Sequence, residues 1–180
     1  MRAEGLAEFR DRYETLIVAA CEWRAMHTEP EPLAAQVFDL LARKNEAPSL
    51  RAAYQLLDKV VFDSYVHHSD GRSFLDKMRG QVATVPNAPQ DTPEEAKLRD
   101  AVSRLRRRDR ELLQRAYWDE LSEPELAEVH AVEVDEIVAR REQALNNYRK
   151  LIARLSPASD PGLAARLLRS IKPGVHTRWE

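Results

Sequence analysis

Side chains that can pair with nucleic-acid bases and phosphates lie close together late in the chain. Arg140 and Arg141 are followed by Gln143 and Asn147 within VDEIVARREQALNNYRK. A guanidinium can donate to phosphate oxygens or to guanine, and a carboxamide pairs well with adenine. The alternative is a solvated helix surface, where basic residues late in a helix complement its dipole. These residue types suggest a nucleic-acid interface, with the structural alternative left open.

A helix-turn-helix pattern positions these residues. The stretch LSEPELAEVHAVEVDEIVA, residues 121–139, places apolar side chains where a compact pair of helices would bury them. Ser122 followed by Glu125, with a proline between them, is a capping box with a tolerated early proline, so it predicts a sharp helix start. We expect this short helix to end near Val129 and the next to run over about 134–155.

The second of these two helices opens with acid, at Glu133, Asp135 and Glu136. Acidic residues in the first turn satisfy free backbone N–H groups and interact favourably with the positive end of the helix dipole. A phosphate would ordinarily occupy the same place. We therefore expect these acids to stabilise the helix and DNA contact to begin one turn later, at Arg140.

The densest basic run is RLRRRDR, which has arginines at 104, 106, 107, 108 and 110. It lies on a helical segment that opens around Lys97, and we expect a break or bend near Arg108–Asp109. The run can line DNA phosphates or contact a protein partner. The alternative is an ordinary charged helix surface with mixed ion pairs.

Three helical segments precede this region. Apolar residues that recur every three or four positions predict helices over about Ala7–Ala25, Leu33–Lys44 and Leu50–Val66. Prolines in HTEPEP separate the first two, and Ser49 is the expected N-cap of the third. In the first segment, Arg24 falls on the same face as the apolar residues.

The predicted fold class is all-α, with two small helical domains joined by a tether. VATVPNAPQDTPEEAK is rich in proline and poor in core residues, which is typical of an extended linker. The resulting domains are 1–80, a linker over 81–96, a helix-turn-helix domain over 97–155 and a C-terminal extension over 156–180. The extension is expected to carry a short amphipathic helix, Leu163–Ile171.

Composition excludes several classes of protein. The chain of 180 residues has 28 Lys and Arg against 30 Asp and Glu, so DNA affinity must depend on local patches. A single cysteine excludes an internal disulfide and gives no metal-ligand spacing.

No apolar run approaches the roughly 20 residues that cross a bilayer, so we expect a soluble, cytoplasmic protein without membrane insertion. The lack of a phosphate loop, a paired-acid pocket or an activated nucleophile favours a non-enzyme without catalytic residues, metal or cofactor.

Over roughly residues 6–155 these motifs resemble bacterial RNA polymerase sigma factors of the sigma-70 family, extracytoplasmic-function type. The residues that match the family's region 4 pattern directly are Leu121, Ser122, Glu125, Leu126, Ala127 and Glu128. The resemblance implies a region 4-like domain that reads the −35 promoter element. Its DNA contacts would be Arg140, Arg141, Gln143 and Asn147, and Arg107 in the basic run would contact the polymerase flap.

The N-terminal part resembles region 2 of the same family. EPLAAQVFDLLAR is similar to the segment that docks on the polymerase clamp, which implies polymerase contacts by Glu31, Gln36 and Phe38. SLRAAYQLLDKVVFDSYVHH is similar to the helix that melts and reads the −10 element. The implied DNA contacts there are Lys59 and Tyr65, the latter by stacking on unwound bases.

The DNA-facing helices depart from the family pattern, since Ala131 replaces the turn glycine, Ala53 a tryptophan and Val60 an asparagine. The resemblance implies a transcription initiation factor that binds core RNA polymerase and promoter DNA, with an anti-sigma or other regulatory protein as a further partner. One alternative is a degenerate sigma-fold regulator that acts through protein–protein contacts with little DNA readout. Another is a helix-turn-helix repressor unrelated to polymerase.

Overall fold

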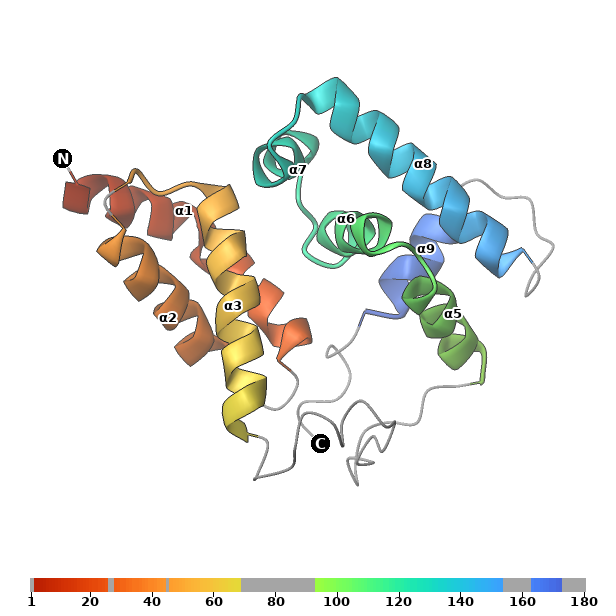
Figure 1. The fold of residues 1–180 in the computed structure, drawn as a ribbon, viewed down its shortest axis with the longest axis horizontal. Coiled ribbons are helices and arrows are strands. Elements are labelled where there is room, and N and C mark those ends of the chain that lie inside the picture. The colour runs from red at the N-terminus through yellow and green to blue at the C-terminus, as the bar shows by residue number, and fades with distance from the viewer. Residues whose placement is uncertain (1, 26–27, 45, 69–92, 154–162, 173–180) are drawn as a thin grey trace.

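The computed structural model describes residues 2–25, 28–44, 46–68, 93–153 and 163–172. This part of the chain is helical throughout and contains no strand, so the predicted all-α class is confirmed. Figure 1 shows two groups of helices, one from each half of the sequence, lying side by side.

The first group contains the three N-terminal helices, α1 (Arg2–Arg24), α2 (Pro30–Arg43) and α3 (Leu50–His68). Helix α2 packs against both of the others. All three predicted segments are present, and α1 begins earlier than expected. The Ala52 N–H donates to the Ser49 hydroxyl oxygen at 3.2 Å, so Ser49 caps α3 as predicted.

The second group contains the remaining helices: α5 (Pro93–Ser103), α6 (Arg107–Tyr117), α7 (Glu123–His130), α8 (Val134–Ile152) and α9 (Leu163–Ser170). Most of the predicted linker, 81–96, lies outside the described residues, and its last residues belong to α5. Helix α8 packs against every other helix of the group.

The break before α6 lies a few residues earlier than predicted from the sequence. The chain leaves the helical conformation over Arg104–Arg106 and not near Arg108–Asp109, and Arg106 has the extended φ and ψ of −56° and 144°. The reason is the burial of Leu105, which is only 6% exposed and packs in the core of this group. Bending at that point turns Leu105 inward.

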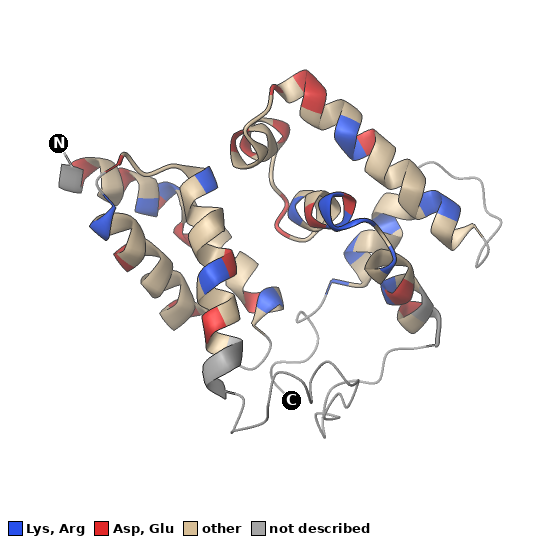
Figure 2. Ribbon diagram, in the orientation of Figure 1, with Lys and Arg blue, Asp and Glu red and all other residues tan. Residues whose placement is uncertain are grey.

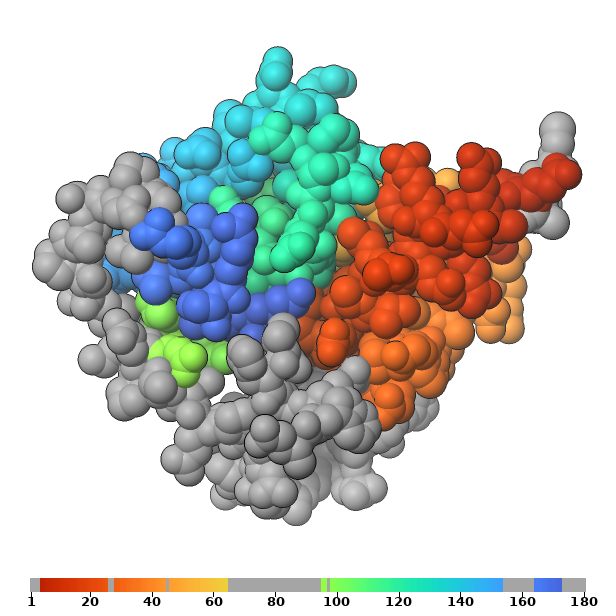
Figure 3. Space-filling model, turned by 180° about the vertical axis from the view of Figure 1, so that it is seen from behind, coloured from red at the N-terminus to blue at the C-terminus, as the bar shows by residue number. Residues whose placement is uncertain are grey.

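A continuous hydrophobic core crosses from one group of helices to the other. Its buried members include Ile17, Val37, Leu57, Leu112, Leu126 and Ile137. Helices α3 and α7 form the main contact between the groups. Figure 3 shows the space-filling N-terminal helices directly against those of the second group. The two halves of the sequence therefore pack together and share apolar burial.

The C-terminal helix α9 closes a second core beneath α8. Leu168 and Ile171 are fully buried there. The Trp118 indole N–H donates to the backbone oxygen of Leu168 at 2.7 Å. The amphipathic helix predicted in the extension therefore covers α6 and α8 of its own chain.

Candidate nucleic-acid interface

Helices α7 and α8 form a helix-turn-helix with a well-defined start. The Ser122 N–H donates to Glu125 Oε2 at 2.8 Å, and the Ser122 hydroxyl donates to the same oxygen at 2.5 Å. The Glu125 backbone N–H reciprocates on the Ser122 side chain, so the predicted capping box is confirmed. Leu126 is fully buried beneath the helix, so the cap fixes where α7 begins and which face it buries.

The turn between the two helices is held in a left-handed conformation. Ala131 has φ and ψ of 53°, and its N–H donates to the Glu128 oxygen at 3.2 Å. The next N–H, of Val132, donates to Ala127 at 3.1 Å. Glycine is the usual residue at such a helix end because a Cβ is strained there. The alanine in place of glycine therefore keeps the turn at a cost in stability.

Helix α8 begins with acids, as its sequence requires. Glu133 occupies the N-cap position, but its side chain makes no capping hydrogen bond. Asp135 and Glu136 lie in the first turn and are exposed. Glu133 thus accepts no capping hydrogen bond from a backbone N–H, and it stabilises the helix only through the dipole, with which Asp135 and Glu136 also interact favourably.

A polar stripe runs along one face of α8 because its members recur every three or four residues. It starts at Glu136, which forms an ion pair with Arg140. The Gln143 carboxamide donates to Asn147 Oδ1 at 3.2 Å, and Asn147 donates to Asp109 Oδ2 on α6 at 2.8 Å. Three of the residues expected to contact DNA therefore share one face, and each already has a polar partner within the chain.

Arg141 lies off this stripe. Its guanidinium donates to Glu123 Oε1 at 2.8 Å, and its side chain is only 23% exposed. The contact joins the start of α7 to α8 and so braces the helix-turn-helix. The Arg140 side chain, at 51% exposed, is the more accessible of the two arginines.

Two adjoining grooves flank the stripe, one of about 800 Å³ and one of about 640 Å³. Both are lined by Asp109 and Gln143. The other basic side chains that line the grooves are Arg104, Arg106, Arg108, Arg140 and Lys150. The other acidic side chains are Asp100, Glu111 and Glu136. Figure 2 shows the two signs interspersed on α6 and α8. The structure thus brings the basic run beside the stripe, but the combined surface is only weakly positive.

The residues expected to contact polymerase and the −10 element lie on α2 and α3, and they differ in how exposed they are. Glu31, Gln36 and Lys59 are exposed on α2 and α3. Phe38 is only 3% exposed and packs near the Phe9 ring, with 6.5 Å between ring centroids, so it is a core residue in this structure. Tyr65 belongs to α3, but its side chain lies outside the described residues.

Arg107, expected to contact the polymerase flap, lies at the first turn of α6. Its side chain is 84% exposed and forms an ion pair with Glu111 at 2.6 Å. An i,i+4 pair on an exposed helix face is weak and easily exchanged for another partner. Arg107 is therefore accessible to an acidic partner.

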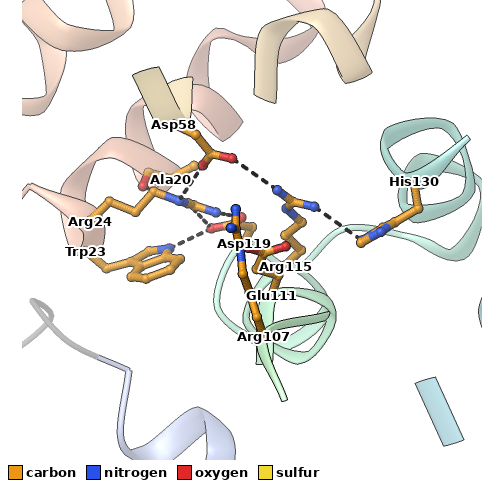
Figure 4. Close-up of polar contacts among 9 residues, drawn as sticks. All are labelled: Ala20, Trp23, Arg24, Asp58, Arg107, Glu111, Arg115, Asp119 and His130. Atoms are coloured by element: carbon orange, nitrogen blue, oxygen red, sulfur yellow. Dashed lines mark hydrogen bonds and ion pairs between the residues drawn. The ribbon is translucent and has the colours of Figure 1, made fainter. Parts of the chain in front are cut away.

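A buried ion pair joins the two groups of helices. Arg24 at the end of α1 donates from both terminal nitrogens to the Asp119 carboxylate, at 2.8 and 2.7 Å. The Trp23 indole donates to the same carboxylate at 2.6 Å. Asp119 has a fully buried side chain, and the Arg24 side chain is 10% exposed. Figure 4 shows the carboxylate enclosed by these donors.

A second layer of charge lies beside this pair. Arg115 on α6 contacts Asp58 on α3 at 3.3 Å, and its other nitrogen lies 3.4 Å from the His130 ring (Figure 4). Burial raises the pKa of Asp58, although Arg115 and Arg24 oppose the change. Burial, and then the charge of Arg115, lower the pKa of His130 from 6.5 to about 4. His130 is therefore neutral at physiological pH.

One further contact ties the helix-turn-helix to the first group. Glu128 on α7 accepts a hydrogen bond from the Leu50 N–H at 2.7 Å, at the start of α3. A carboxylate at a helix N-terminus accepts a hydrogen bond from a free backbone N–H and interacts favourably with the helix dipole. Glu128 thus caps a helix of the other group.

This junction was not predicted from the sequence. Its signal was Arg24, a charged residue on an otherwise apolar helix face, because such a residue needs a buried partner. The partner, Asp119, is 95 residues away and has no local pattern to distinguish it from other acids.

Comparison of the chain with known protein families, curated proteins and solved structures found no match. Among the described residues, no cluster of three or more His, Cys, Asp or Glu side chains could hold a metal ion. No helix in the same part of the chain is both long and apolar enough to span a bilayer.

Proposed function

We propose that this protein is a sigma-like transcription initiation factor. It binds core RNA polymerase through its N-terminal helices, and α8 directs it to promoter DNA. The proposal places the protein in the cytoplasm, requires no cofactor and leaves the chemistry to the polymerase. Two domains, 1–80 and 97–155, would separate on the polymerase to reach the −10 and −35 elements.

The observation that carries this proposal is the alignment of Arg140, Gln143 and Asn147 on one face of a helix-turn-helix. Their stripe faces grooves lined by arginines of the basic run. Guanidinium and carboxamide groups are the side chains that read base edges, and nearby arginines supply phosphate contacts. The ion pair of Arg140 with Glu136 is exposed, so phosphate can replace the carboxylate.

A second function is favoured by the junction between the two groups. Arg24 and Asp119 are buried together, and a shared core joins the groups. Separating them would expose this core and break the ion pair. A sigma-fold regulator that keeps both halves together and acts through protein–protein contacts would not incur that cost.

Transcription with purified components tests the proposal. The full-length chain would be mixed with core RNA polymerase and genomic DNA from the organism that encodes it, and run-off transcripts would be mapped. Core binding with transcripts from defined start sites supports the initiation factor. Core binding without such transcripts favours the regulator, and failure to bind core polymerase contradicts both.

Matched variants test the role of α8. Arg140→Ala is expected to lower promoter affinity by about 1–3 kcal/mol without loss of core binding. Glu136→Gln removes the competing acid and is expected to raise affinity. Arg10→Ala is the control, because Arg10 makes a comparable exposed i,i+4 pair with Glu14 on α1. Equal affinity for the wild type and the Arg140 variant would remove α8 from the proposed interface.

A further inference from the structure

A cleft between the two groups of helices has the size and lining of a small-molecule site. Its volume is about 580 Å³, and its walls come from α1 and α3 on one side and from α5 and α6 on the other. Ligand sites typically have volumes of roughly 300–1,000 Å³ and often lie where domains meet. The residues that line this cleft differ from those that line the grooves beside α8.

The lining of the cleft includes aromatic and aliphatic side chains from both groups. Trp23 and Trp118 meet edge to face, with 4.8 Å between ring centroids and an interplanar angle of 82°. Val61 on α3 and Val102 on α5 add aliphatic surface. Both indole N–H groups are hydrogen-bonded and Arg24 lies over the Trp23 ring, 4.1 Å from its centroid, so the two rings form a fixed part of the lining.

The charges around the cleft favour an anion. Arg110 lines it from the second group, and Asp58, which contacts Arg115, is the only acid among the described lining residues. Arg24 also lines the cleft, but the buried Asp119 behind it balances its charge. One Arg110 nitrogen donates to the Ser103 oxygen at 3.0 Å, which orients the guanidinium. A guanidinium held in this way can pair with a carboxylate.

We propose that this cleft binds a small organic acid with an apolar body. The body packs against the apolar lining, and the carboxylate pairs with Arg110. Because the ligand contacts both groups of helices, binding favours their packed arrangement. The inference goes beyond the proposed function and does not depend on it.

Equilibrium dialysis of the full-length protein with a matched pair of probes tests this inference. Naphthalene-1-acetate carries the apolar body and the carboxylate, whereas naphthalene-1-acetamide has nearly the same shape without charge. We expect saturable one-to-one binding of the acid and at least about tenfold weaker binding of the amide, as expected for a lost charge-assisted hydrogen bond. Equal affinity for the two probes, or no saturable binding of the acid, would overturn the proposal.

Two variants locate the site. Arg110→Gln is expected to remove the preference for the acid, and Arg51→Gln, at an exposed arginine on α3, is expected to bind both probes like the wild type. Ser103→Phe places a ring at the exposed rim of the cleft and is expected to block both probes. Far-UV circular dichroism would check that each variant is folded. Unchanged binding in both Arg110→Gln and Ser103→Phe would place the probe elsewhere and contradict the assignment.

Discussion

Arg24 and Asp119 are 95 residues apart in the sequence and form a bidentate, buried ion pair that joins the two halves of the protein. Both hydrogen bonds are shorter than 3 Å, and the Trp23 indole supplies a third donor to the carboxylate. Buried charges are tolerated only when they are paired and hydrogen-bonded. The packing of the two helix groups therefore depends on both residues.

Removal of Asp119 should strongly destabilise the protein. Asp119→Ala leaves the Arg24 charge buried without its main partner, which costs about 3–5 kcal/mol. The free energy of unfolding, measured by urea titration, tests this value. Glu14→Ala, which breaks the exposed pair with Arg10, is the control and should cost no more than about 1 kcal/mol.

The double variant Arg24→Met with Asp119→Leu separates the effect of the pair from that of an unpaired charge. Replacing a buried ion pair by apolar residues of similar volume is often neutral or stabilising. We expect the double variant to be more stable than Asp119→Ala. If it were less stable, the unpaired charge of Arg24 would not explain the loss of stability in Asp119→Ala.

The turn of the helix-turn-helix offers a stabilising substitution. Ala131 has a φ of 53°, where a left-handed alanine costs roughly 1–2 kcal/mol more than glycine before the greater flexibility of unfolded glycine is counted. Ala131→Gly should therefore raise the free energy of unfolding by up to about 1 kcal/mol. Ala139→Gly, at an exposed position inside α8, should lower it by roughly 0.5–1 kcal/mol. The same sign for both variants in urea titration would contradict the strain assigned to Ala131.

The carboxylate of Glu128 should stabilise the first group of helices from across the junction. Glu128→Ala removes the acceptor for the Leu50 N–H, and loss of a hydrogen bond to a charged group costs about 1.5–3 kcal/mol. Glu133→Ala is the matched comparison, because Glu133 is an N-cap acid without a capping hydrogen bond. Its loss should cost less than about 1 kcal/mol. Equal losses for the two variants in urea unfolding would argue against the cross-junction cap.

Stability should fall in mild acid because of His130. Its pKa is lowered to about 4 in the folded protein by burial and by Arg115, whereas the unfolded chain protonates near 6.5. As pH falls, the unfolded state therefore binds the proton first. The contribution of His130 to the free energy of unfolding is fully present above about pH 6.5 and is lost as pH falls toward 4.

Comparison of the wild type with His130→Gln at pH 7.5 and pH 5 isolates this contribution. The wild type should lose more stability between the two pH values than the variant does, as measured by the urea midpoint. The Arg115 charge lies 3.4 Å from the ring, so Arg115→Gln should reduce part of the wild-type loss. Identical pH dependence in the wild type and His130→Gln would contradict the lowered pKa.

Local patterns in the sequence predicted most of the helical structure. The capping box at Ser122 and the N-cap at Ser49 were found because each is set by neighbours within three residues. The break before α6 was misplaced because burial of Leu105, a tertiary contact, decided its position. For the same reason, periodicity could not tell whether Phe38 faces the core or a partner.

The residue types that form the candidate site were predicted, but the side chains with which they pair were not. Arg140, Gln143 and Asn147 share a face as helical spacing requires. Their pairing with acids such as Glu136 and Asp109 depends on how side chains turn and on how α6 crosses α8. The buried junction depends on residues nearly a hundred positions apart, and no local signal identifies the acid that pairs with Arg24.

The core that crosses between the groups also bears on how the protein folds and unfolds. Because Leu57 and Leu126 belong to one apolar cluster, the two halves lose that burial together. Heating the protein should therefore give a single cooperative transition, with equal calorimetric and van't Hoff enthalpies. These long-range contacts require the chain to close a large loop, so folding should be slower than in helical bundles whose contacts are mostly local.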